Sequence, residues 1–190
     1  MDLQPLKELL KEECHYQLRE EVMDEFLSFG TLVELDRGEP IISPGEVNPH
    51  IYIVMDGIMR RWFWNSDKEV TISFALAGTL FFSNHSYYMD QESVFGFDAC
   101  TPVKLLKIKR EHYNGLIASN HEFCQWALSM AKCQLWYYDM KDNVFQGTAR
   151  ERYDALLKNR PDILQQVSLG IIASYLRITP QYLSKLRNEE

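Results

Sequence analysis

The polar side chains best placed to do chemistry lie near the C-terminal end, on one face of a predicted helix. Calculated at 100° per residue, this face consists of Gln181, Ser184, Lys185 and Asn188, with Thr179 at the helix start and Tyr182 and Arg187 on the flanks. Amide, hydroxyl and cationic groups of this kind hydrogen-bond to DNA base edges and phosphates. An ordinary solvated helix face carries the same residue types, so this face alone does not decide the function.

Two short helices joined by a tight turn would position this face. Thr179 can cap the second helix, and Pro180 fits its first position, where a missing N–H costs nothing. Ile172 and Leu176 share one face of the preceding helix, and the small Ala173 allows close approach of the two helices. This spacing is typical of a helix-turn-helix, whose second helix enters the major groove of DNA.

One residue departs from the usual helix-turn-helix pattern, because Arg177 stands in the turn where glycine is common. A non-glycine residue in a left-handed turn conformation costs roughly 1–2 kcal/mol. This departure keeps open an alternative in which the chain has the fold of a DNA-binding dimer but acts as a scaffold without DNA recognition.

The net charge of −7 is unevenly distributed along the chain. Residues 146–190 hold seven Lys/Arg and five Asp/Glu, a net charge of +2, and the remainder therefore carries −9. An acidic body with a mildly basic end fits a two-part regulator. The small basic excess predicts modest non-specific DNA affinity, which a dimer would increase by doubling the contacts.

Composition indicates a globular protein, because 46% of the residues are hydrophobic. No apolar run approaches the ~20 residues of a membrane span, and the first residues lack a signal-peptide core. We therefore expect a cytoplasmic protein without membrane association. Zinc, disulfide and iron–sulfur frameworks have no support, because the cysteines are scattered and form no C-x-x-C pair. The cysteines are Cys14, Cys100, Cys124 and Cys133.

Within the first two thirds of the chain, the predicted secondary structure changes from helix to strand near residue 29. Residues 1–28 have the apolar spacing of helices, whereas residues 29–110 contain β-rich runs separated by frequent turn signals. The runs are 51–55, 59–64, 70–76 and 103–108. They predict a small antiparallel sandwich or barrel, followed by a helical link over 111–118.

A long helix is predicted to begin at a capping box, Ser119 to Glu122, and to run to about residue 145. Its heptad seam, typical of a homodimer interface, consists of Phe123, Trp126, Met130, Cys133, Tyr137, Met140 and Val144. A second apolar stripe consists of Cys124, Leu128, Ala131, Leu135 and Tyr138. One stripe can pack on the β-rich part while the other meets a second copy. A single buried core helix is the alternative.

A second capping box, Thr148 to Glu151, opens the C-terminal helices, and Pro161 ends the first of them. The sequence thus predicts an α+β fold in three parts. Residues 1–118 form helices and an antiparallel β-roll, 119–146 form a dimerisation helix, and 147–190 form the helix-turn-helix module.

In this arrangement the chain resembles the Crp/Fnr family of bacterial transcription regulators over nearly its whole length. The β-rich part is similar to a cyclic-nucleotide-binding fold in GEPII from Gly38, PGE from Pro44, IYIVMDG from Ile51 and EVTISF from Glu69. The most specific similarity is the end, TARERYDALLKNRP followed by IASYLRITPQYLSKLR. The resemblance implies a DNA-binding homodimer that a small-molecule effector controls, with RNA polymerase as a further partner.

The resemblance also locates a ligand pocket, which consists of Gly78, Thr79, Leu80, Phe81, Phe82, Glu92 and Ser93. Family members that bind cyclic nucleotides use Gly-Glu for the ribose and a later Arg-Ser or Arg-Thr for the phosphate. Here Thr79 replaces the Glu, and Glu92 stands where the Arg should be. A carboxylate facing a phosphate is repulsive. We expect weak or no cyclic AMP binding, no cofactor, and either an apolar or uncharged effector or a filled pocket.

Three alternatives remain at this point. The chain could bind cyclic AMP despite the altered loop, or act as the scaffold dimer described above. A cupin-like enzyme would need a metal cluster such as H-x-H, which the five histidines never form, so we expect no enzyme activity. An oxygen-sensing branch would need clustered cysteines near the N-terminus, where only Cys14 lies. His85 lies in the pocket loop, but a lone histidine is usually an ordinary polar residue.

Overall fold

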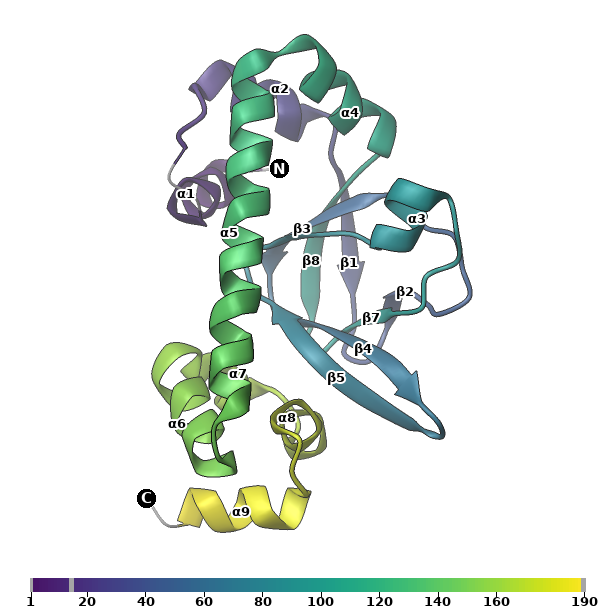
Figure 1. Ribbon diagram of the computed structural model, residues 1–190. Coiled ribbons are helices and arrows are strands. Elements are labelled where there is room, and N and C mark those ends of the chain that lie inside the picture. Colours follow the sequence, from purple (N-terminus) through teal and green to yellow (C-terminus); the bar gives the residue numbers. More distant parts are fainter. Residues whose placement is uncertain (1, 14–15, 189–190) are drawn as a thin grey trace.

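The computed structural model describes residues 2–13 and 16–188. The long helix α5 (His121–Gln146) runs along the molecule, with a β-roll on one side of it and helices at both ends (Figure 1). The predicted domain boundaries, after residues 118 and 146, fall beside the two ends of this helix. Cys14 and one of the five histidines, His15, lie outside the described residues.

Two four-stranded antiparallel sheets form the β-roll, which confirms the predicted α+β fold class. The first sheet has the order β1 (Thr31–Leu35), β8 (Val103–Ile108), β3 (Ile51–Asp56), β6 (Leu80–Phe81). The second has the order β2 (Pro40–Ile42), β7 (Gly96–Ala99), β4 (Met59–Asn65), β5 (Lys68–Ala75). The sequence predicted the four longest strands and missed β1, β2, β6 and β7.

Aromatic stacking fills the space between the two sheets. The Phe81 ring lies 5.4 Å from the Tyr52 ring and 5.1 Å from the Phe97 ring, centroid to centroid, and both pairs are nearly parallel. Each of these three residues is at least nine-tenths buried. The interior of the roll is therefore packed, and open space lies outside it, toward α5.

Four further helices accompany the roll: α1 (Gln4–Glu13), α2 (Glu20–Ser28), α3 (Asn84–Met89) and α4 (Arg110–Ser119). The first half of α5 packs into a core with α1, α2 and α4, where the Phe26 ring contacts the rings of Phe123 and Trp126 at 5.0 and 5.5 Å. Phe123, Trp126 and Met130 are almost fully buried within the chain. The predicted dimer seam is therefore wrong over this half, because the N-terminal helices already cover it.

The start of α5 also differs from the sequence prediction. Ser119 ends α4, and its hydroxyl donates to the Gly115 carbonyl, so it does not cap α5. The cap is Asn120, whose side-chain oxygen accepts from the Phe123 N–H at 3.1 Å. Glu122 binds Arg19 instead of completing a capping box.

The C-terminal module consists of α6 (Ala149–Asn159), α7 (Pro161–Gln166), α8 (Leu169–Leu176) and α9 (Pro180–Asn188). Thr148 and Glu151 form the predicted capping box at the start of α6. Arg177 adopts the left-handed conformation, with φ 56° and ψ 45°, as the sequence predicted. Its guanidinium lies 5.0 Å from the centroid of the Phe145 ring, a contact that offsets part of the backbone cost.

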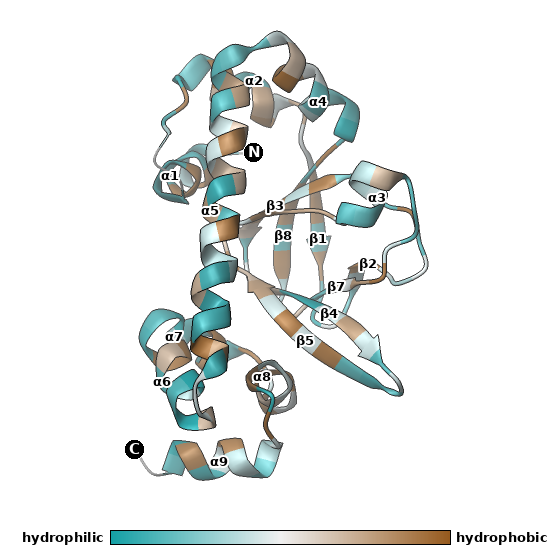
Figure 2. Ribbon diagram, viewed as in Figure 1, coloured by the Kyte–Doolittle hydropathy of each residue, from teal (hydrophilic) through white to brown (hydrophobic). Residues whose placement is uncertain are grey.

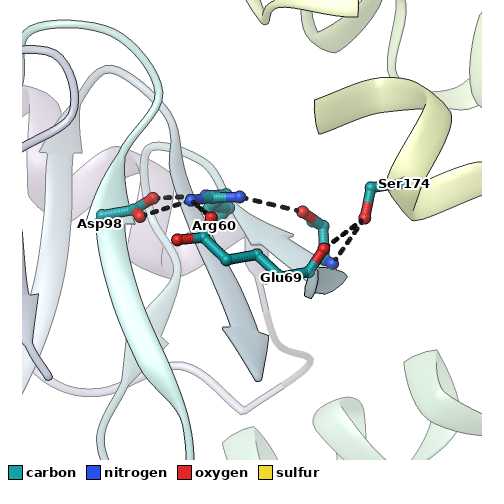
Figure 3. Close-up of polar contacts among 5 residues, drawn as sticks. Arg60, Glu69, Asp98 and Ser174 are labelled. Carbon is teal, nitrogen blue, oxygen red and sulfur yellow. Dashed lines mark hydrogen bonds and ion pairs between the residues drawn. The ribbon is translucent and has the colours of Figure 1, made fainter. Parts of the chain in front are cut away.

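A bulge in β5 attaches this module to the β-roll. The register of β4 and β5 shifts between Arg61 and Trp62, which leaves Ile72 without a partner residue on β4. Beside the bulge, the Thr71 N–H donates to the Ser174 hydroxyl of α8 at 3.0 Å, and that hydroxyl donates to the Glu69 carbonyl at 3.3 Å (Figure 3). The first helix of the helix-turn-helix is thus bound to the β-roll.

Candidate DNA-binding face and sensor cavity

Helix α9 presents a polar face to solvent at one end of the molecule (Figure 1). Leu183 and Leu186 are buried and hold α9 against the rest of the module, whose core includes Ile172 of α8. The alternation of these apolar residues with polar ones is visible along α9 in Figure 2. The exposed residues of α9 after Pro180 are Gln181, Tyr182, Lys185 and Asn188.

Three more of the residues predicted for DNA contact form hydrogen bonds at or near the ends of the helices of this module. The Thr179 hydroxyl accepts from the Tyr182 N–H at 3.2 Å and so caps α9. The Ser184 hydroxyl donates to the Pro180 carbonyl at 3.1 Å, and the Arg187 guanidinium donates to the Leu164 carbonyl at 2.5 Å. These side chains fix the position of the helix.

A cavity of about 730 Å³ lies between the β-roll and α5. Its wall comes from α1, both sheets of the roll, α3, α4, α5 and the C-terminal module. Of the residues that the resemblance implied, Thr79, Leu80, Phe81 and Phe82 line the cavity. Gly78, Glu92 and Ser93 do not.

The loop expected to hold a cyclic phosphate does not fit that group. Glu92 is exposed and outside the cavity wall, so it does not face a ligand there. Ser93 is buried, and its hydroxyl donates to the Phe95 carbonyl at 2.7 Å. Residues 78–93 contain no Lys or Arg, so the loop offers no cation to a phosphate. The absence of a cation, and not repulsion by Glu92, is the feature that disfavours cyclic nucleotides.

One cation of the cavity wall, Arg60, is already paired with carboxylates of the protein. Arg60 of β4 forms a bidentate pair with Asp98 of β7, at 2.6 Å from Nε and 2.7 Å from Nη2 (Figure 3). Its Nη2 also donates to Glu69 at 2.5 Å. Although burial opposes the charged form, these carboxylates raise the pKa of Arg60 further above its usual range. Arg60 therefore stabilises the sheet and is not a ligand anchor.

Two other cations in the cavity wall, Arg61 of β4 and Lys141 of α5, were not identified from the sequence. The Arg61 guanidinium donates from Nη1 to the Tyr138 hydroxyl at 3.1 Å and lies 4.0 Å from the centroid of the Phe95 ring. The Lys141 ammonium donates to the Ile72 carbonyl at the bulge. Burial, and then the charge of Arg61, lower the pKa of Lys141 to about 8. No sequence motif joins two positions so far apart in the chain.

Comparisons with known proteins agree with this architecture. Residues 32–120 match the cyclic nucleotide-binding domain family. The chain contains a cyclic nucleotide-binding domain. Its structural neighbours are Crp/Fnr-family transcriptional regulators, which confirms the resemblance at the level of this domain and the fold. No curated protein matches the chain with significant sequence similarity.

Three solved structures illustrate the similarity of fold. FixK2 from Bradyrhizobium japonicum superposes with a TM-score of 0.72 and 18% identity, covering 84% of this chain and 83% of FixK2. The c-di-GMP responsive global regulator CLP from Xanthomonas campestris gives 0.71 and 13%, covering 90% and 91%. The Thermus thermophilus Catabolite Activator Protein gives 0.56 and 21%, covering 98% and 86%. The cyclic nucleotide-binding domain here thus sits in the same arrangement of helices as in these proteins.

The described part of the chain shows neither a membrane-spanning helix nor a metal-binding cluster. None of the helices found there is both long enough and apolar enough to cross a bilayer. Within the same residues, no group of three or more His, Cys, Asp or Glu side chains is placed to hold a metal ion.

Proposed function

We propose that this protein is a DNA-binding transcription regulator that acts as a homodimer. The observation that carries the proposal is α9, a capped and firmly packed helix whose exposed face offers Gln181, Lys185 and Asn188. Amide side chains pair with adenine edges and lysine with guanine or phosphate, so this face has the chemistry of a reading helix. The shared fold with the Crp/Fnr regulators supports the same conclusion.

The dimer would form through the second apolar stripe of α5. With the first half of the predicted seam buried against the N-terminal helices, Leu128, Leu135 and Tyr138 of the second stripe remain 47, 65 and 43% exposed. These positions follow the spacing of a coiled-coil seam, and such a run of exposed apolar side chains is unusual on a monomer. A parallel pairing of two α5 helices would bring two α9 helices to the same side, as a two-fold symmetric operator requires.

The sensor in this proposal is the cavity rather than the phosphate loop. Its wall joins the β-roll to α5 and to Tyr175 of α8, so an occupant would contact both the sensor part and the DNA-binding module. The loop of residues 78–93 has no cation for a cyclic phosphate, so this loop would not anchor a cyclic nucleotide.

DNA binding tests the central claim. We expect the protein to select two-fold symmetric sites from genomic fragments at low salt, with affinity that falls as salt increases. The double variant Gln181→Ala, Lys185→Ala should weaken binding to the selected site by at least tenfold, because two base-edge or phosphate contacts are lost. Gel shift or fluorescence anisotropy measures the affinity.

A matched control uses Lys158→Ala, which removes an exposed lysine from α6 instead of α9. This variant should bind the selected DNA as the wild type does. If the double variant also binds like the wild type, α9 is not the reading helix. If no selection occurs at any salt concentration, the scaffold alternative is supported instead.

A further inference from the structure

The cavity beside α5 combines apolar walls with two cations that lack carboxylate partners. Arg61 and Lys141 form no ion pair with any described residue, and their hydrogen bonds go to the Tyr138 hydroxyl and the Ile72 carbonyl. The Nε of Arg61 is buried without a hydrogen-bond partner among the described residues. A buried donor left without an acceptor is costly, and so are two like charges close together. An anion between them would remove both costs.

The other charged groups of the wall, Arg60, Glu13 and Arg160, lie near charges of opposite sign. Among the described lining residues, Glu13 is the single carboxylate, and the charge that acts on it is that of Arg160. Burial raises the pKa of Glu13, whereas Arg160 lowers it. Glu13 and Arg160 thus balance each other, and the uncompensated positive charge is that of Arg61 and Lys141.

The rest of the wall is suited to an apolar body. Aromatic and aliphatic side chains dominate it, among them Phe74, Phe82, Tyr88 and Ile117. The volume of about 730 Å³ lies within the range of small-molecule sites. An apolar or uncharged effector, as the sequence indicated, would leave Arg61 and Lys141 uncompensated.

We propose that this cavity binds an amphipathic organic anion, with its apolar or aromatic body against the aromatic wall and its single acidic group between Arg61 and Lys141. The inference rests on the proposed function, because it names the ligand class of that sensor. It is separate from the cyclic-phosphate loop, since its two anchors lie on β4 and α5. The occupant would also contact Ile163 and Tyr175 of the C-terminal module.

Two fluorescent probes with the same aromatic body test the inference. 1-Anilinonaphthalene-8-sulfonate carries one anionic group, and N-phenyl-1-naphthylamine is its uncharged counterpart. Both are titrated into the full-length protein at pH 7. Lys141→Met and Arg61→Met remove the charges while keeping apolar stems, and Lys158→Met removes a charge outside the cavity.

We expect the sulfonate to bind one site per chain, and either cavity variant to weaken it at least tenfold. Lys158→Met should leave its affinity unchanged. The uncharged probe should bind all four proteins within twofold of one another, which also shows that the variants retain the cavity. The inference is overturned if the wild type does not bind the sulfonate, if both cavity variants bind it normally, or if the two probes lose affinity equally. This experiment does not measure DNA binding, so the inference about the cavity and the proposed function can be refuted independently of each other.

The pH dependence of probe binding gives a second readout. With a pKa of about 8, Lys141 is mostly charged at pH 7 and mostly neutral at pH 9.5, whereas the sulfonate stays charged throughout. The charges acting on it are Arg61 of β4, Asp142 of α5 and Arg177 in the turn after α8. The affinity of the wild type should therefore fall between these pH values and that of Lys141→Met should not. Equal profiles for the two proteins would contradict the assignment of Lys141.

Discussion

The buried pair of Arg60 and Asp98 allows a quantitative prediction of stability. The two residues face each other across β4 and β7, and their side chains are only 10 and 11% exposed. Asp98→Asn keeps the shape of the side chain but removes the charge that the guanidinium requires. Breaking a buried pair in this way costs about 3–5 kcal/mol. Because Glu69 remains as a second partner, we expect a loss of about 3 kcal/mol.

Urea denaturation measures this loss, and thermal unfolding gives an independent value. At about 2–4 °C per kcal/mol for a chain of this size, the midpoint should fall by roughly 6–12 °C. Glu69→Gln is the matched control, because its side chain is 37% exposed and its pair with Arg60 is screened by solvent. That variant should lose less than about 1 kcal/mol.

Two results would refute this reasoning. One is a loss below about 1 kcal/mol for Asp98→Asn, which would mean that water reaches the guanidinium. The other is a Glu69→Gln variant as unstable as Asp98→Asn, which would mean that the exposed partner carries the interaction.

Two further predictions concern the turn of the helix-turn-helix and the nucleotide loop. Arg177→Gly should be more stable to urea than Arg177→Ala by about 1–2 kcal/mol. Both variants lose the contact with Phe145, but only glycine relieves the strain of the left-handed backbone. Equal stabilities would show that this backbone carries no strain. Calorimetry with cyclic AMP and cyclic GMP should detect no binding, since residues 78–93 provide no cation. Micromolar affinity for either nucleotide would contradict this account of the loop.

The parts of the fold that local sequence signals determine could be predicted. Thr148 and Glu151 act within four residues of each other, and so do Thr179 and Tyr182, so their caps can be recognised from the chain alone. The left-handed turn at Arg177 follows from the same local pattern. The longer strands could be recognised because their β-rich runs lie between turn signals.

Features of the fold that depend on contacts between residues far apart in the sequence could not be predicted. Helix α5 has two apolar stripes of similar spacing, and only the packing of Phe26 on Phe123 and Trp126 decides which one is buried. The short strands β2 and β6 have too few residues for a period to show. The cavity was missed for the same reason, since Arg61 and Lys141 meet only after β4 and α5 have packed together.

The bulge in β5 has a consequence for the solubility of the protein. As the last strand of its sheet, β5 would offer free backbone groups to a strand from another molecule, which is a route to aggregation. Here the Thr71 amide and the Glu69 carbonyl are bound by Ser174, and the Ile72 carbonyl is bound by Lys141. Helices α5 and α8 therefore also protect the sheet edge, and any movement of these helices away from the roll would expose β5.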